Sequence, residues 1–207
     1  MSLSITNIIF DVGGVLLKYR PKEYTHRIIS DPEEAETVYR NLFDGNEWKQ
    51  IDGGTMTEEE GVARVVNRIP QFADSVQLAM ANWPSCLKVN EGMPEILNRL
   101  KSENYNLYLL SNTSLRFYEY CSKFEMFRLF DGMVISAKEK LLKPDPAIYQ
   151  CLIKRFHLKP QECLFIDDTQ VNVEGAENVG IHGHHFVKAE ELDSYFRSVG
   201  FYKCAAF

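Results

Sequence analysis

The sequence has no hydrophobic run long enough to cross a bilayer and no segment of low complexity. A membrane-spanning helix needs about 20 consecutive, mostly apolar residues, and no run in these 207 residues approaches that length. The opening residues also lack the charged and apolar regions of a secretory signal. Because 45% of the residues are hydrophobic, the chain can close a core, which excludes a disordered or fibrous protein.

Basic residues are not concentrated in any part of the chain. Lys and Arg number 23 against 29 Asp and Glu, which gives a formal net charge of −6. A protein that binds a nucleic-acid backbone normally shows a basic stripe. We therefore expect no nucleic-acid partner and, without a bilayer-spanning run, no membrane partner.

Cysteine pairs of the CxxC type are absent, and the number of cysteines is odd. The five cysteines are Cys86, Cys121, Cys151, Cys163 and Cys204. Such scattered cysteines are typical of free thiols in a reducing compartment, so we predict a cytoplasmic protein. No pattern in the sequence specifies an oligomeric state.

Short apolar runs alternate with helical patterns over most of the chain. The runs, which are typical of buried strands, lie at residues 8–10, 107–110, 133–135, 164–166 and 185–187. The helical patterns lie at 94–101, 115–124, 146–156 and 171–179, and a last helix begins near 189. This alternation favours an α/β fold with a Rossmann-like core, in which helices cover both faces of a parallel sheet.

Residues 18–88 depart from this alternation, because they contain helix signals and no convincing strand. An N-cap followed by Pro lies at 31–34, a capping box at 57–60, and a further helical stretch at 70–83. The sequence therefore predicts an all-helical cap at 18–88, inserted after the first strand. Residues 1–17 and 89–207 would form the core.

Polar residues follow several of the predicted strands. They form four groups: Asp11, Ser111 with Asn112, Lys143, and Asp167 with Asp168. On a parallel sheet the carboxyl ends of the strands share one edge, so we expect these groups to converge. Clustered carboxylates repel one another unless a cation lies between them, and Mg²⁺ prefers such oxygen ligands together with substrate phosphate. The set suits phosphoryl transfer to a carboxylate nucleophile.

These groups lie within four segments that resemble the signature motifs of the haloacid dehalogenase superfamily. The segments are 10–15 (FDVGGV), 110–113 (LSNT), 143–146 (KPDP) and 165–169 (FIDDT) with Asn172. Their order is that of the family, and the resemblance covers nearly the whole chain. The helical insert matches members with a cap after the first strand, and the first motif resembles the sugar-1-phosphate phosphatase branch.

The resemblance implies a Mg²⁺-dependent phosphatase that acts on small phosphorylated metabolites through an aspartyl-phosphate intermediate. By match to the motifs, Asp11 would be the nucleophile and a Mg²⁺ ligand. The backbone carbonyl of Gly13 and the carboxylate of Asp168 would be further ligands. Asp167 would orient a metal-bound water.

The same match implies how the phosphate is held. Ser111 and the Asn112 amide would bind phosphate oxygens, and Lys143 would neutralise charge near the nucleophile. Asn172 lies about one helical turn beyond Asp168, so it could reach back to the site. It could equally be a surface residue of its helix.

Position 13 departs from the family pattern. Most phosphatases of the superfamily carry a second Asp there, which protonates the leaving alcohol, whereas this chain has Gly13. General acid–base help is typically worth ~10²–10⁴ in rate. Either the substrates have good leaving groups, or a residue such as Lys18, Tyr19 or Asp52 supplies the proton. Otherwise the chain is a catalytically impaired, ligand-binding homologue.

A 2-haloacid dehalogenase is a further alternative. Dehalogenases of the superfamily also lack the second Asp, because a halide leaves without a proton. They need no metal, however, and usually lack the paired acidic residues of the last motif. The presence of Asp167 and Asp168 therefore favours the phosphatase.

Two other patterns are interpreted as packing. His182, His184 and His185 fall at the last strand, where the rings are expected beside the sheet rather than on a metal. Phe124, Phe127 and Phe130 recur at helix-like spacing and are interpreted as core or cap-packing residues rather than a cofactor-binding motif. The other aromatic of interest, Trp48, is expected to stabilise the helical insert.

Overall fold

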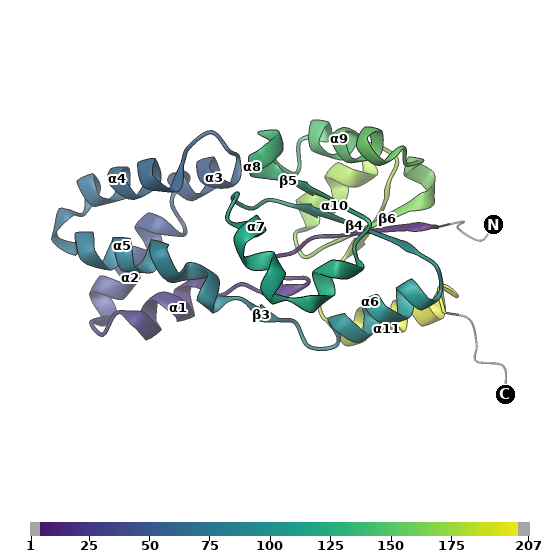
Figure 1. Cartoon of the computed structure of the whole chain (residues 1–207), viewed down its shortest axis with the longest axis horizontal. Coiled ribbons are helices and arrows are strands. Elements are labelled where there is room, and N and C mark those ends of the chain that lie inside the picture. The colour runs from purple at the N-terminus through teal and green to yellow at the C-terminus, as the bar shows by residue number, and fades with distance from the viewer. Residues whose placement is uncertain (1–4, 203–207) are drawn as a thin grey trace.

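A five-stranded parallel sheet lies at the centre of the computed structural model, which describes residues 5–202 (Figure 1). The strand order is β5-β4-β1-β6-β7, so the first strand of the chain is the middle strand of the sheet. The strands are β1 (Asn7–Phe10), β4 (Asn106–Ser111), β5 (Gly132–Ile135), β6 (Cys163–Asp167) and β7 (His182–His185).

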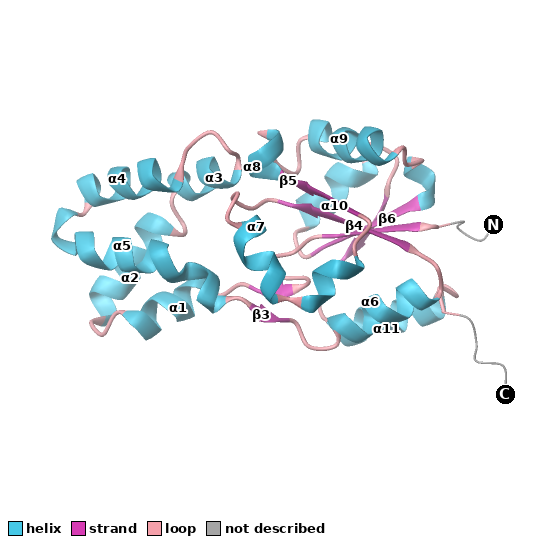
Figure 2. Ribbon diagram, in the orientation of Figure 1, coloured by secondary structure: helices cyan, strands magenta, loops and turns pink. Residues whose placement is uncertain are grey.

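Both faces of the sheet are apolar, because alternate residues of each strand point to opposite sides. Ile8 and Phe10 face one side, while Ile9 faces the other. Helices cover both faces (Figure 2). On the Ile9 side lie α9 (Pro146–Phe156) and α10 (Gln170–Glu177), and on the other lie α6 (Met93–Ser102) and α11 (Ala189–Ser198).

A separate group of helices lies beyond the carboxyl ends of the strands (Figure 1). These are α1 (Pro21–Ile28), α2 (Pro32–Leu42), α3 (Asn46–Asp52), α4 (Glu58–Arg68) and α5 (Ala73–Asn82). Thr57 and Glu60 form the predicted capping box at the start of α4. A two-stranded antiparallel ribbon, β2 (Leu17–Lys18) with β3 (Lys88–Val89), joins this helical group to the sheet.

The structure confirms the predicted α/β architecture and corrects some of its boundaries. The last strand ends at His185 instead of covering 185–187. The helix expected at 115–124 is reduced to α7 (Phe117–Tyr120), which is followed by two 3₁₀ turns. The stretch expected to contain no strand carries β2 and β3 at its two ends. The remaining α-helix of the described residues is α8 (Ser136–Glu139).

Four of the cysteines are free thiols, and Cys204 lies outside the described residues. No helix within residues 5–202 combines the length and the apolar character needed to span a membrane.

Candidate active site

The carboxyl edge of the sheet brings together polar residues that are far apart in the sequence. Asp11 directly follows β1, Ser111 ends β4 and Asp167 ends β6. Because β1 lies between β4 and β6 in the sheet, these three residues are neighbours at one edge. All three are buried, so their polar groups need partners within the protein.

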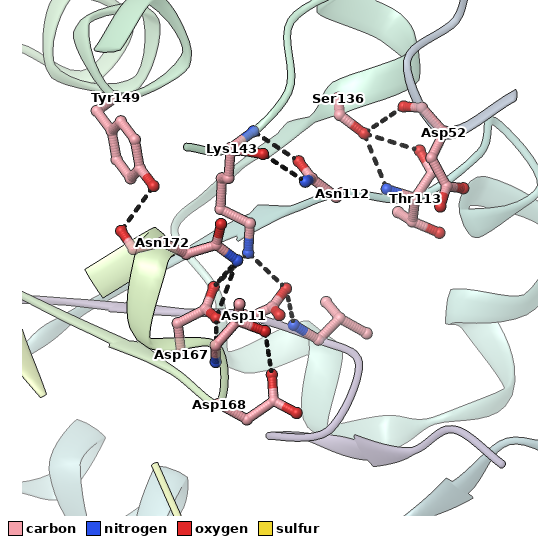
Figure 3. Close-up of polar contacts among 12 residues, drawn as sticks. Asp11, Asp52, Asn112, Thr113, Ser136, Lys143, Tyr149, Asp167, Asp168 and Asn172 are labelled. Atoms are coloured by element: carbon pink, nitrogen blue, oxygen red, sulfur yellow. Dashed lines mark hydrogen bonds and ion pairs between the residues drawn. The ribbon is translucent and has the colours of Figure 1, made fainter. Parts of the chain in front are cut away.

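Lys143 supplies the positive charge at this edge. Its Nζ lies 2.9 Å from Asp11 Oδ1 and 2.6 Å from Asp167 Oδ2 (Figure 3). Burial alone would lower the pKa of Lys143, but the two carboxylates outweigh that effect and raise it. The ammonium group therefore stays charged at neutral pH.

The backbone of Lys143 is fixed by the side chain of Asn112. The Lys143 N–H donates to Asn112 Oδ1 at 2.9 Å, and Asn112 Nδ2 donates to the Lys143 carbonyl at 3.0 Å. This pair of bonds ties the Lys143 loop to the end of β4 (Figure 3). The side chain of Asn112 thus positions Lys143, while its backbone amide remains the group predicted to bind phosphate.

Asp167 is surrounded by donors. Besides Lys143, Thr169 N donates to Oδ1 at 2.8 Å, and Asn172 Nδ2 lies 3.1 Å from Oδ1 and 3.2 Å from Oδ2. Asn172 is buried, and its carbonyl accepts a bond from Tyr149 Oη at 2.7 Å. Of the two interpretations of Asn172, the structure therefore supports the one that reaches the site (Figure 3).

Asp11, Asp167 and Asp168 form an acidic cluster. One carboxylate oxygen of each lies within 4.8 Å of the others, and the first two residues are buried. Burial raises the pKa of Asp11 to about 6; Lys143 opposes the rise and Asp167 adds to it. Burial, and next Asp167, also raise the pKa of Asp168. These raised pKa values record mainly the cost of burying charged carboxylates, to which the charge of Asp167 adds.

The loop after β1 leaves room for Asp168 because of Gly14. At Gly14, φ is +76° and an added Cβ would lie 1.9 Å from Asp168 Oδ2, so only glycine allows this approach. The carbonyl of Asp168 contacts a ring nitrogen of His185 at 2.9 Å. The neighbouring His184 stacks on Tyr195 with ring centroids 4.2 Å apart. These two rings pack beside the strand as expected.

The acidic cluster fits a divalent cation. Its donors are carboxylate oxygens, the ligand type that Mg²⁺ prefers, and a cation there would stabilise the charged forms of these buried carboxylates. Gly13, whose carbonyl is the further predicted ligand, lies in the same loop two residues after Asp11.

A cavity of about 60 Å³ lies next to this edge of the sheet. Gly13, Ser111 and Asn112 contribute to it from the core. Opposite them, the helical segment and its connections contribute a carboxyl group and aromatic rings. These residues are Tyr19, Trp48, Asp52 and Trp83.

Of the three candidates for the missing proton donor, the structure places two in the cavity and one outside it. Lys18 pairs with the exposed Glu91 at 3.3 Å and lines a surface groove instead of the cavity. Tyr19 and Asp52 both line the cavity. Trp48 packs on Trp83 with centroids 5.4 Å apart, as expected of a stabilising residue, but it also forms part of the cavity wall.

Three further residues at the site, Ser136, Trp83 and Tyr120, carried no predicted role. Ser136 Oγ donates to the carbonyl of Asp52 at 2.5 Å and accepts from Thr113 N at 2.8 Å. It therefore links the helical segment to the loop after β4. The sequence signal that could have identified Ser136 was its position directly after the strand predicted at 133–135. Trp83 and Tyr120 line the cavity, and no motif distinguished them from other aromatic residues.

Comparisons with known proteins agree with this geometry. The sequence model of the haloacid dehalogenase-like hydrolase family matches residues 5–180. Sesquiterpene phosphatase astK of Aspergillus oryzae is 26% identical, over 86% of this chain and 87% of its own. The phosphorylated carbohydrates phosphatase of Thermotoga maritima is also 26% identical, over 84% and 81%.

Solved structures share the fold. A HAD family enzyme of Bacteroides thetaiotaomicron, in complex with magnesium and inorganic phosphate, superposes with a TM-score of 0.73 and 26% identity. The match covers 93% of this chain and 100% of that one. An L-2-haloacid dehalogenase of Xanthobacter autotrophicus has the same fold at 16% identity, with a TM-score of 0.67 over 95% and 86% of the two chains. This chain therefore belongs to the haloacid dehalogenase-like hydrolases.

Proposed function

We propose that this chain is a Mg²⁺-dependent phosphatase of small phosphorylated metabolites, with sugar phosphates among its substrates. The observation that carries the proposal is the position of Asp11: its buried carboxylate pairs with Lys143 and lies within an acidic cluster. The cavity beside it is lined by Ser111 and Asn112. The phosphatase names of the relatives above support the same class of reaction.

In the first step, the carboxylate of Asp11 attacks phosphorus and the bond from phosphorus to the leaving oxygen breaks. Lys143 offsets negative charge on the nucleophile and on the transferring group. Ser111 and the backbone amide of Asn112 would hold phosphate oxygens. The product is an aspartyl phosphate at position 11.

In the second step, water attacks the phosphorus of the aspartyl phosphate and the bond to Asp11 breaks. The products are inorganic phosphate and the original carboxylate. Asp167 and Asn172 keep Lys143 in place through both steps, since their bonds connect it to β6 and α10.

Asp11, the carbonyl of Gly13 and Asp168 would hold the Mg²⁺, and Asp167 would contact it through water. When bound, Mg²⁺ would stabilise negative charge on the phosphoryl oxygens.

Residues 18–88 would act as a cap over a core of residues 1–17 and 89–207. The cavity is small, about 60 Å³, so entry of a phosphorylated metabolite would require the cap to move away from the core. Closure would then exclude water from the reaction.

A dehalogenase remains the second candidate, because Gly13 leaves no acid at the usual position. One experiment separates the two functions. Purified protein is assayed for phosphate release from a panel of phosphorylated metabolites, with Mg²⁺ and after chelation, and for halide release from 2-chloropropionate. The variant Asp11→Asn serves as the inactive control in both assays.

The phosphatase proposal expects phosphate release that chelation abolishes and no halide release. Halide release that is insensitive to chelation would instead establish the dehalogenase. Binding of phosphate or a phosphorylated ligand without turnover of any compound would indicate a catalytically impaired homologue.

A further inference from the structure

We infer that Asp52 donates the proton to the leaving-group oxygen, in place of the Asp that is missing at position 13. The inference rests on the proposed phosphatase activity and adds to it a residue from the helical segment. It also widens the substrate class, because a protein with its own proton donor can act on phosphates of poorly acidic alcohols.

Contacts with the core fix the backbone around Asp52. This residue ends α3, and its carbonyl accepts a hydrogen bond from Ser136 Oγ at 2.5 Å. Two residues later, Gly54 has φ +64° and passes so close to the Ala137 carbonyl that an added Cβ would lie 2.0 Å from its oxygen. The segment from Asp52 to Gly54 therefore packs directly against the core.

Asp52 and Gly13 line the same small cavity. A Cβ added at Gly13 would have no heavy atom within 4 Å, so the space that the family's acid would occupy is open. Because the cavity is small and Asp52 forms part of its wall, a leaving oxygen placed there would lie within reach of Asp52, directly or through one water.

The surroundings of Asp52 favour its protonated form. Burial raises the pKa of Asp52 well above its ordinary value, and the nearby carboxylates of Glu58 and Asp11 add to the rise. The backbone N–H of Ser114 opposes it. A neutral carboxyl group does not repel a phosphate dianion, and it carries the proton that the leaving oxygen requires.

Tyr19 is the alternative donor in the cavity. Its Oη is buried and has no hydrogen-bond partner among residues 5–202. Burial raises the pKa of Tyr19 well above its ordinary value, so its hydroxyl is a weak acid. We assign Tyr19 a hydrogen bond to the bound ligand and leave the proton transfer to Asp52.

The proton balance closes over the two steps. In the first, the leaving oxygen keeps the electron pair of its bond to phosphorus and takes the proton of Asp52, while Asp11 becomes phosphorylated. In the second, water adds its oxygen to phosphorus and returns a proton to Asp52. Asp11 and Asp52 then both have their starting forms.

The test measures kcat/KM with Mg²⁺ for a series of aryl and alkyl phosphates of rising leaving-group pKa. The variants are Asp52→Asn, Gly13→Asp and the double variant, with Asp44→Asn as a matched control because Asp44 is an exposed Asp of the same helical segment. Activity on 4-nitrophenyl phosphate, whose leaving group needs little help, shows that each variant is folded.

We expect Asp52→Asn to lower kcat/KM by ~10²–10⁴ for alkyl phosphates and by less than about 10-fold for 4-nitrophenyl phosphate. Adding Gly13→Asp to this variant should restore activity on alkyl phosphates, and Asp44→Asn should match the wild type. A loss in Asp52→Asn that is equal for all leaving groups, or no loss at all, would overturn the inference. Wild-type protein without Mg²⁺-dependent phosphate release would instead overturn the proposed function.

Discussion

Lys143 is a buried cation between two carboxylates, with a fully buried side chain. Replacing Lys143 with Met would leave Asp167 buried without its charged partner. Breaking one side of a buried ion pair typically costs ~3–5 kcal/mol, so the free energy of unfolding of Lys143→Met should fall by about that amount. Urea denaturation measures it.

The matched control is Lys123→Met, because Lys123 is exposed and should tolerate the change with little effect. If Lys143→Met were as stable as this control, Lys143 would not be the counter-charge that holds the site together.

At the scale of single residues, the sequence indicated which side chains gather but not how they pair. The positions of Asp11, Ser111 and Asp167 at strand ends followed from the apolar runs before them. The bond from Asn172 to Asp167 depends on the rotation of α10 against β6. Sequence spacing allowed that bond without requiring it, so a surface position for Asn172 was equally compatible.

Helix α4 depends on the capping box at its start. Thr57 Oγ1 accepts a bond from the Glu60 N–H at 3.2 Å, and the Glu60 carboxylate accepts one from the Thr57 N–H at 2.9 Å. Thr57→Ala should lower the free energy of unfolding by ~1 kcal/mol, measured by urea denaturation. Thr57→Ser keeps the hydroxyl group and should be close to the wild type; an equal loss in both variants would contradict the role of the cap.

Helices α1 and α2 are linked by Glu36, which pairs with Lys22 and His26 of α1 and with Arg40 of its own helix. Hydrogen bonds from Arg40, then Lys22, lower the pKa of Glu36 to about 2. Because folding lowers the pKa of Glu36, its ionised carboxylate stabilises the folded protein at pH values above the ordinary pKa of 4.5. This stabilisation is lost as the pH falls toward 2 and the carboxylate becomes protonated.

Glu36→Gln should therefore unfold at a lower temperature than the wild type at pH 7. The difference between the two melting temperatures should shrink as the pH is lowered from 5 toward about 2. A difference that is constant across this range would show that the charge of Glu36 is not responsible.

The helices predicted most accurately are those whose first residues carry a clear capping pattern. The helix predicted at 146–156 matches α9 at both ends, because Asp145 caps it and Pro146 starts it. The helix predicted at 115–124 is a single α-helical turn, Phe117–Tyr120, followed by 3₁₀ structure, which has three residues per turn. The spacing of Phe124, Phe127 and Phe130 fits that period, and the three rings pack on one another.

The last strand shows where pairing overrides the apolar pattern. An apolar run favoured residues 185–187, but β7 pairs with β6 in a register that joins His182 to Leu164 and His185 to Asp167. As an edge strand, β7 needs hydrogen bonds to its single neighbour more than apolar side chains on both faces. The sequence alone does not show that register.

In the whole molecule, Arg116 connects the helical segment to the core. It pairs with Glu58 of α4 and donates to the carbonyls of Met80 at 2.8 Å and Ala81 at 3.2 Å in α5. Arg116→Ala should loosen the closed arrangement and lower kcat/KM by roughly 10- to 10²-fold, because reacting groups tolerate little misplacement.

The control for Arg116→Ala is Arg128→Ala, which removes a surface arginine whose partner is the exposed Glu125. Steady-state kinetics with any substrate that releases phosphate would measure both variants. Equal kinetics in the two variants would show that closure does not depend on Arg116.

The sequence predicted the arrangement of the whole molecule, but not how closely the helical group approaches the sheet. Alternating strands and helices predicted the sheet, and the strand-free stretch predicted the helical group beyond it. How close Asp52 comes to Ser136 depends on the Ser136 side chain of α8 meeting the Asp52 backbone carbonyl of α3 across the two parts. Hydrophobic periodicity does not predict a contact between two distant segments. The sequence therefore could not show which of Asp52, Lys18 and Tyr19 is the better candidate for the proton donor.

The central claim is that Asp11 accepts the phosphoryl group. Its most direct test is to quench the enzyme during turnover with Mg²⁺, reduce it with borohydride, and map the peptides by mass spectrometry. An aspartyl phosphate is reduced to homoserine, so we predict homoserine in place of Asp11, and none when Mg²⁺ has been chelated. Steady turnover with Asp11 unmodified, together with full activity in Asp11→Asn, would contradict the account.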